Sequence, residues 1–277
     1  MNLNDLNEKI TSILKEAEIK EAELEAFYII EYVMHLSRSM YFLKKREEVC
    51  SGDIEQCIAI AEKRKTHMPL QYILGKQEFM GLEFKVTPAV LIPRQDTEGL
   101  VEKVLRQIKP GMRILDMCTG SGCIAISLAK YGKDIQVSAA DISMEALKVA
   151  RENATANEVV VDFIESDMFQ RITQKYDVIV SNPPYIKSEV VATLMAEVRD
   201  YEPHLALDGK EDGLYFYRKL AKEAGEFLVP GGMLCLEIGY DQGMEVSQLL
   251  SRQGFVEVQV EQDLCGLDRN VYGKLPE

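Results

Sequence analysis

The chain has 277 residues, and its 32 Lys and Arg against 45 Asp and Glu give a formal net charge of −13. Its apolar content of 47% and charged content of 28% are those of an ordinary globular protein, which excludes extended disorder. A protein that binds a phosphate backbone needs a basic surface, so the net negative charge of this chain argues against direct nucleic-acid binding.

No segment resembles a targeting or membrane sequence. The N-terminal residues are polar, and no apolar run has the length of a membrane span. The six cysteines form no CxxC pair and the three histidines are scattered, so neither a metal site nor a disulfide framework is expected. We therefore expect a cytoplasmic protein without metal and without membrane association.

The spacing of apolar residues changes twice along the first third of the chain. Residues 1–66 carry apolar side chains at three- and four-residue steps, which predicts helices. From Gln77 to Thr87 apolar and polar residues alternate around Gly81, which predicts a β-hairpin. We accordingly expect a helical domain at 1–68, a hairpin linker at 69–96 and a third domain at 97–277.

Beyond Pro110, strand patterns alternate with helix patterns. The expected strands cover 113–116, 135–140, 159–165, 176–181, 233–238, 255–260 and 271–273. The expected helices lie at about 122–131, 143–155, 213–227 and 241–252. This order predicts a Rossmann-like α/β fold with a seven-stranded, mainly parallel sheet whose last two strands form an antiparallel edge hairpin.

A glycine loop follows the first of these strands, in the run Cys118-Thr119-Gly120-Ser121-Gly122. Glycines at the carboxyl end of a strand let the backbone approach a ligand closely. Asp141 follows the next strand, where a carboxylate can accept hydrogen bonds from both ribose hydroxyls of a nucleoside. Asp167 and Met168 follow the third strand, in position to meet an adenine ring.

Together these strand ends predict a nucleoside site but leave the ligand open. The run from Gly120 to Ala125 also fits the G-x-G-x-x-G/A pattern, so NAD binding is an alternative at this point. Asp116, just before the loop, is expected to support it.

The run Ser181-Asn182-Pro183-Pro184-Tyr185 directly follows a strongly apolar strand. Two prolines fix two φ angles and remove two donors, so the corner is stiff and cannot continue a sheet. Asn182 Oδ1 and the Pro183 carbonyl are acceptors that can together bind both hydrogens of one NH2 group. Tyr185 offers a flat face to a planar group.

Alkylation of a planar, weakly nucleophilic nitrogen is the chemistry that uses such a corner. Two acceptors orient the NH2 group and stabilise the positive charge that develops on its nitrogen. The corner therefore favours a transferase that acts on an amide or an exocyclic amine, and it decides against NAD.

With these residues in place, the sequence resembles the HemK/PrmC family, the glutamine methyltransferases that modify peptide chain release factors. The glycine loop with Asp141 resembles the cofactor site of class I methyltransferases, and Asn182 to Tyr185 match the signature of N-methyltransferases of amides and exocyclic amines. Further segments that resemble the family lie at 69–75, 91–98, 201–203, 206–207, 237–239 and 268–269.

The resemblance implies methyl transfer from S-adenosylmethionine to the glutamine side-chain amide in the Gly-Gly-Gln loop of a release factor. It implies a helical domain that recognises this protein substrate. The cofactor would be bound by Cys118, Thr119, Gly120, Ser121, Gly122, Asp141, Asp167, Met168 and Asn182. The substrate glutamine would be held by Asn182, Pro183, Pro184 and Tyr185, of which Asn182, Pro183 and Tyr185 would be catalytic.

Two positions depart from the usual pattern of class I methyltransferases. Cys118 stands where many of these enzymes have glycine, so we expect no positive φ there. Met168 stands where relatives often have an aromatic residue, so the adenine contact would be softer.

Two other functions stay open from the sequence. An adenine-N6 DNA methyltransferase would use a similar corner to hold a flipped base, but it would need a basic surface that this chain lacks. A translation-associated binding protein would need neither the loop nor the corner. Arg94, Glu237 and Arg269 receive no assigned role: Arg94 fits either a ligand carboxylate or a salt bridge that joins the domains, and Glu237 fits a structural role equally well.

Overall fold

The computed structural model describes all 277 residues, and the chain divides into two compact units. The helical unit comprises Met1–Gly75 together with Met195–Tyr201, and the sheet unit comprises Lys76–Leu194 together with Glu202–Glu277. The short segment Met195–Tyr201 thus belongs to the helical unit although it lies far along the chain.

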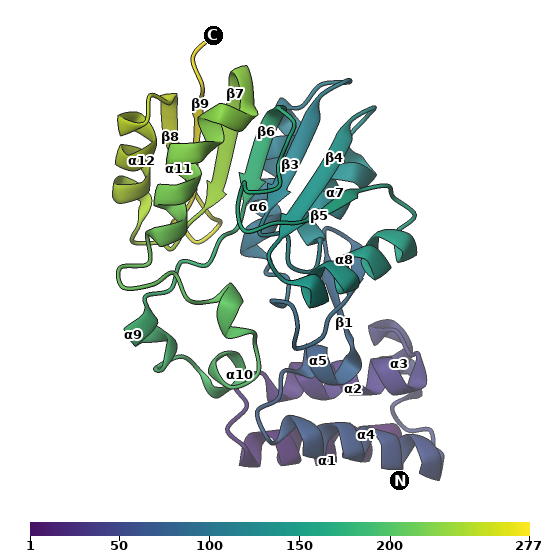
Figure 1. Ribbon diagram of the computed structural model, residues 1–277. Coiled ribbons are helices and arrows are strands. Elements are labelled where there is room, and N and C mark those ends of the chain that lie inside the picture. Colours follow the sequence, from purple (N-terminus) through teal and green to yellow (C-terminus); the bar gives the residue numbers. More distant parts are fainter. The chain divides into compact units, whose positions relative to one another are not determined.

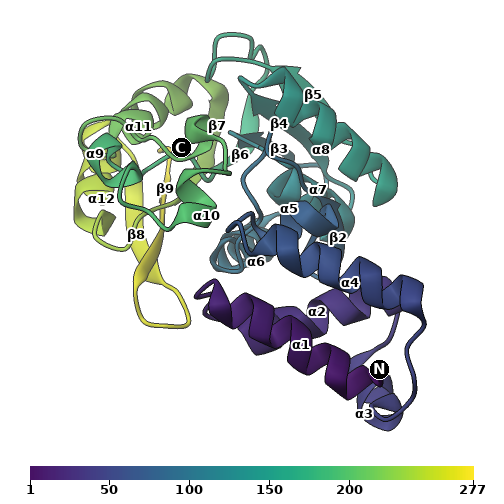
Figure 2. The ribbon, with the colours of Figure 1, turned by 90° about the horizontal axis from the view of Figure 1, so that it is seen from below.

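The helical unit is built from packed helices (Figures 1 and 2), and their apolar side chains form one buried cluster. These helices are α1 (Leu3–Glu16), α2 (Ala22–Met34), α3 (Arg38–Lys44), α4 (Ser51–Arg64), α5 (Leu70–Leu74) and the short α10 (Ala196–Arg199). Leu6 and Ile10 of α1 are fully buried against Ile29 and Ile30 of α2. The predicted helical character of residues 1–66 is confirmed.

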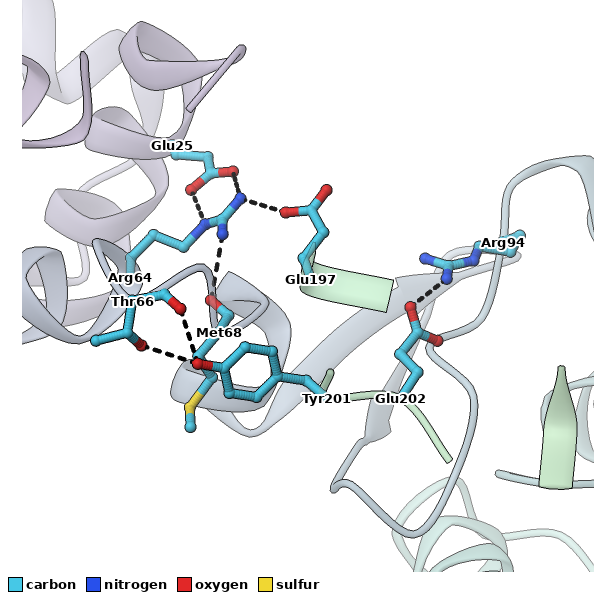
Figure 3. A network of polar contacts seen from close by, with 8 residues as sticks. All are labelled: Glu25, Arg64, Thr66, Met68, Arg94, Glu197, Tyr201 and Glu202. Atoms are coloured by element: carbon cyan, nitrogen blue, oxygen red, sulfur yellow. Dashed lines mark hydrogen bonds and ion pairs between the residues drawn. The ribbon is translucent and has the colours of Figure 1, made fainter. Parts of the chain in front are cut away.

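A buried arginine ties the segment Met195–Tyr201 to this unit (Figure 3). Arg64 of α4 donates Nε to Glu25 at 2.7 Å and Nη2 to the same carboxylate at 3.0 Å. Arg64 Nη2 also donates to Glu197 of α10 at 2.6 Å. At the end of the segment, Tyr201 Oη donates to the Thr66 carbonyl at 2.7 Å. The segment is therefore held by polar contacts near its middle and at its end.

The sheet unit begins with the predicted hairpin, formed by β1 (Lys76–Phe79) and β2 (Leu82–Lys85). Its two turn residues, Met80 and Gly81, have φ of 53° and 71°. Two consecutive left-handed residues match the right-handed twist of the flanking strands. Phe79 and Phe84 are buried in the hydrophobic core on one face of the seven-stranded sheet.

A seven-stranded sheet forms the body of the unit, in the order β5-β4-β3-β6-β7-β9-β8. The strands are β3 (Arg113–Met117), β4 (Gln136–Asp141), β5 (Asp162–Glu165), β6 (Tyr176–Ser181), β7 (Leu228–Glu237), β8 (Val256–Gln262) and β9 (Asp268–Lys274). All neighbours are parallel except β9, which runs antiparallel to both β7 and β8. The predicted fold and its antiparallel edge hairpin are confirmed.

Three strands begin three or more residues away from the expected positions of 159, 233 and 271, and the third of them, β9, begins early, at Asp268, where it already pairs with β8. The first strand begins only at Asp162, since Val160 is 93% exposed and has no core to pack against. The second begins five residues early, at Leu228, because pairing with Tyr176 extends it across Gly231 and Gly232.

Helices cover both faces of the sheet. One face packs Ile114, Val178 and Cys235 against α6 (Asp96–Gln107) and α7 (Cys123–Tyr131), with α8 (Met144–Ala156) beside α7. The other face packs Leu115 and Leu234 against α11 (Tyr215–Phe227) and α12 (Gly243–Arg252), which Figure 1 shows beside β7 to β9. The short α9 (Ser188–Val191) and the 3-10 turn His204–Ala206 complete the elements.

No helix of the structure is both long enough and apolar enough to span a membrane.

Candidate active site

The carboxyl ends of β3, β4, β5 and β6 surround a cavity of about 310 Å³ in the sheet unit. Open parallel sheets bind their ligands at this edge, in crevices of this size or larger. Met117, the last residue of β3, is aligned with Ala140 of β4 and with Ser181 of β6. The segments that follow these residues therefore start side by side, and the cavity lies among them.

Asp116 anchors the glycine loop from below, as expected. Its Oδ2 accepts hydrogen bonds from Thr119 Oγ1 at 2.6 Å and from the Ala125 amide at 3.1 Å. Burial raises the pKa of Asp116 to about 7, although both hydrogen bonds lower it. Its other oxygen, Oδ1, is buried and has no hydrogen-bond partner.

The prediction that Cys118 lacks a positive φ is wrong, because its φ is 62°. The chain turns sharply where it leaves β3. This turn requires a left-handed backbone at position 118, whichever residue occupies it. Such a conformation costs a residue with a Cβ about 1–2 kcal/mol, and the surrounding loop enforces it here.

The two glycines of the loop have different surroundings. Gly120 has a φ of 55°, and a Cβ built on it would meet no atom within 4 Å, so its backbone borders open space in the cavity. Gly122, with a φ of 83°, does not line the cavity. A Cβ there would lie 2.9 Å from Ile126 and 3.1 Å from Ala150, so this glycine lets α7 pack closely against α8.

Asp141, the last residue of β4, lines the cavity and fixes the loop at the same time. Its Oδ2 accepts from the Gly120 amide and its Oδ1 from the Ser143 amide, each at 2.9 Å. Burial raises the pKa of this carboxyl, while the backbone hydrogen bonds lower it. Each oxygen can accept a further hydrogen bond, so the orientation suits a pair of ligand hydroxyls.

Asp167 and Met168 also line the cavity, beyond the end of β5. Met168 is 4% exposed, and Ser166 Oγ donates to its carbonyl at 2.6 Å. Lys219 of α11 places its Nζ 3.4 Å from Asp167 and over the Tyr215 ring at 5.5 Å. Lys219 and Tyr215 line the cavity too, and the sequence pattern gave no sign of either residue.

The Asn-Pro-Pro-Tyr corner follows β6 directly and forms part of the cavity wall. Asn182 and Pro184 line the cavity, and Asn182 Nδ2 donates to Thr97 Oγ1 of α6 at 3.2 Å. Pro183 is buried and does not line it. The Tyr185 ring packs against the core instead of the cavity, and burial raises its pKa to about 12.

Comparison with known proteins matches both units. A family model described as the PrmC N-terminal domain matches residues 5–75, and one described as the methyltransferase small domain matches residues 95–210. A release factor glutamine methyltransferase of Clostridium acetobutylicum is 38% identical over 278 residues, covering 98% of this chain and 98% of the relative. The enzyme of that name from Geobacter sulfurreducens is 41% identical, covering 95% of this chain and 93% of the relative.

The chain belongs to the release factor glutamine methyltransferase family. Among solved structures, a methyltransferase from Pyrococcus furiosus is similar, with a TM-score of 0.55, 18% identity and coverage of 79% of this chain and 98% of the other. At that identity the similarity concerns the fold alone, which is the one that class I methyltransferases share.

The segment 201–203, which received no role from the sequence, contributes a residue that contacts the rim of the cavity. Glu202 accepts from the Ile92 amide at 3.2 Å and forms an ion pair with Arg94, which lines the cavity (Figure 3). Both Arg94 and Glu202 belong to the sheet unit, so this pair does not join the two units. Arg269 instead pairs with Asp96 at 3.4 Å and with Asp263 at 3.1 Å.

Proposed function

We propose that this protein transfers the methyl group of S-adenosylmethionine to the side-chain amide nitrogen of the glutamine in the Gly-Gly-Gln loop of peptide chain release factors. The proposal rests above all on Asn182, whose amide lines the cavity while its Nδ2 donates to Thr97. Oδ1 is then the atom that remains to accept a hydrogen bond from a ligand.

The residues present fit the nucleoside part of S-adenosylmethionine. The backbone at Gly120 leaves open space, and Asp141 presents two oxygens that are already oriented by backbone amides. We propose that Cys118 to Ser121 with Asp141 hold the ribose end, and that Asp167 and Met168 contact the adenine. Gly122 would act through close packing of α7 rather than through ligand contact.

The corner residues would prepare the glutamine for attack. Asn182 Oδ1 and the Pro183 carbonyl would each accept one hydrogen of the amide NH2, which fixes its orientation. The Pro183 ring is buried and does not line the cavity, so only the backbone oxygen of this residue would meet the substrate. Both acceptors would also stabilise positive charge that develops on the nitrogen. When bound, S-adenosylmethionine supplies a methyl group already activated on a sulfonium. Tyr185, which packs against the core, would stiffen the corner, and Pro184 would border the substrate.

We propose that the helical unit docks the release factor, since relatives that match this chain across both units carry the name release factor glutamine methyltransferase. Its residues 1–68 contain the helices that would form the docking surface. A substrate in the translation machinery would place the protein in the cytoplasm.

A methylation assay tests the proposal. The protein is incubated with methyl-labelled S-adenosylmethionine and a purified release factor, the same factor with its Gly-Gly-Gln glutamine changed to alanine, or duplex DNA. Label is expected in the first factor only. Label in DNA, or equal label in both factors, would refute it.

A further inference from the structure

The side chain of Asn182 is held between Thr97, which also lines the cavity, and Glu237, which does not. Thr97, at the start of α6, is 2% exposed and accepts from Asn182 Nδ2. Glu237, the last residue of β7, is 1% exposed and lies beside both residues. Burial raises the pKa of Glu237 to about 7, while hydrogen bonding to Thr97 and Asn182 and the nearby Arg269 charge lower it.

Two buried oxygens close to this group lack any hydrogen-bond partner: Glu237 Oε2 and Asn270 Oδ1. Glu237 and Asn270 are directly opposite each other in the antiparallel pair of β7 and β9. Directly opposite residues project from the same face of a sheet, with Cβ atoms about 5 Å apart. Two acceptors brought together in this way would repel each other, whereas a proton on Glu237 Oε2 would make them a donor and an acceptor.

The direction of the hydrogen bonds at the Thr97 hydroxyl agrees with such a proton. Its hydroxyl accepts from Asn182, so its own hydrogen must be donated elsewhere, and the carboxyl of Glu237 is the acceptor beside it. A neutral Glu237 would accept from Thr97 on Oε1 and donate from Oε2 to Asn270. The Thr97 hydroxyl and the protonated Oε2 then each have an acceptor, and neither Glu237 Oε2 nor Asn270 Oδ1 stays unsatisfied.

We propose that Glu237 is a positioning residue, which as a neutral acid linked to Asn270 holds Thr97 and the Asn182 amide so that Asn182 Oδ1 faces the substrate. This inference rests on the proposed glutamine methylation. Glu237 would not touch the substrate, because it does not line the cavity. Loss of its proton would put an unpaired negative charge beside Asn270 and loosen the orientation of the corner.

Several titratable or charged groups face Glu237 from the surrounding elements. They are Asp96 of α6, Cys123 of α7, Tyr185 after β6, Tyr217 of α11 and Arg269 of β9. Burial raises the pKa of Cys123 and Tyr185 to about 12 and that of Tyr217 well above its ordinary value, so none of the three titrates near neutral pH. Burial also raises the pKa of Asp116 below the glycine loop to about 7, so a change around pH 7 is assigned to Glu237 by its disappearance in Glu237→Gln.

The test compares Glu237→Gln, Glu237→Leu and Thr97→Val for steady-state kinetics between pH 6 and 9. Glu237→Gln reproduces the neutral acid, with an oxygen for Thr97 and an NH2 for Asn270. It is expected to keep most of the kcat and to lose the wild-type decline of kcat as pH rises through about 7. Glu237→Leu and Thr97→Val are expected to lower kcat about 10²-fold at every pH, with the Kd for S-adenosylmethionine unchanged.

A matched control is Ser127→Ala in α7, which removes another buried polar atom without a partner but one far from the corner in sequence. It should leave kcat and its pH profile as in the wild type. If Glu237→Gln loses as much kcat as Glu237→Leu, or keeps the decline above pH 7, the proposal is wrong.

A second measurement separates this proposal from the proposed function. In protein labelled with ¹³C at the glutamate carboxyl carbons, NMR should show one carboxyl that titrates near pH 7 and disappears in Glu237→Gln. This signal does not depend on any substrate. Its absence would overturn the neutral-acid assignment even if release factor is methylated, and its presence would stand even if another amide proves to be the substrate.

Discussion

Tyr201 and Glu202 are consecutive residues whose side chains are anchored in different units. Tyr201 Oη donates to the Thr66 carbonyl of the helical unit, whereas Glu202 accepts from the Ile92 amide of the sheet unit and pairs with Arg94 (Figure 3). The chain that leaves the Asn-Pro-Pro-Tyr corner thus enters the helical unit at Met195 and returns at Glu202, beside cavity residues. Both anchors can be tested separately.

Removal of the Glu202 carboxylate should destabilise the sheet unit mainly through Ile92. The Glu202 side chain is 1% exposed, whereas that of Arg94 is 40% exposed and can be solvated instead. Glu202→Ala leaves the Ile92 amide without its acceptor, so we expect the free energy of unfolding to fall by about 2 kcal/mol. Urea denaturation measures this loss. Glu202→Gln keeps an oxygen for Ile92 and should lose less; an equal loss would assign the effect to the ion pair.

The contact between Glu197 and Arg64 should control local opening of the segment Met195–Tyr201. Glu197→Ala leaves Arg64 paired with Glu25, so the rest of the helical unit should remain folded. A loss of about 1 kcal/mol would raise amide hydrogen exchange in this segment roughly fivefold. Glu189→Ala changes the charge equally at an exposed position outside the segment and serves as control. Faster exchange across all of α1 to α5 would instead indicate global destabilisation.

The left-handed backbone at Cys118 should make glycine better than alanine at this position. Cys118→Gly and Cys118→Ala both remove the thiol, so their difference isolates the cost of a Cβ at a φ of 62°. We expect the glycine variant to be more stable than the alanine variant by about 1 kcal/mol, since part of the steric gain is offset by unfolded-state entropy. Thermal and urea denaturation of the two variants provide the comparison. Greater stability of the alanine variant would contradict it.

Asp116 should make stability fall as pH rises from about 4 to 7. An aspartate in an unfolded chain has a pKa of about 3.9, whereas burial raises the pKa of Asp116 to about 7. The unfolded state therefore releases its proton first and is stabilised relative to the folded state over that interval. The full effect is roughly 4 kcal/mol above pH 7. Asp116→Asn removes it while keeping an oxygen for Thr119 and Ala125. Urea denaturation at several pH values should show the variant gaining stability relative to the wild type as pH rises; parallel curves would disprove the prediction.

Local patterns predicted the elements of the sheet unit well. The apolar run Tyr176–Ser181 is observed with the expected bounds, and Gly81 lies in the expected hairpin turn. The glycine loop, Asp141 and Asn182 also meet at one cavity, because parallel strands bring their carboxyl ends to the same edge.

Features that depend on distant partners were not predictable in this way. Glu197 reaches Arg64 across 133 positions, and Glu202 reaches Arg94 across 108, so no periodicity or spacing links them. Cys118 shows the other limit: its φ is set by the path of the chain out of β3 and not by the residue type. The sequence feature that pointed to Glu202 was its position in a segment that resembles the family. Such a resemblance does not say which residues Glu202 contacts.

Asn182 provides the most direct test of the chemistry. Asn182→Ala removes the Oδ1 acceptor and the donor to Thr97, so the glutamine NH2 would lose one of its two proposed contacts. Because such a contact acts on charge that develops during transfer, kcat should fall about 10² to 10³-fold. The proposed ribose contacts at Asp141 would remain, so calorimetry should give a nearly unchanged Kd for S-adenosylmethionine. Retained turnover would show that Asn182 does not orient the amide, and a parallel loss of cofactor affinity would place its main contact on the cofactor instead.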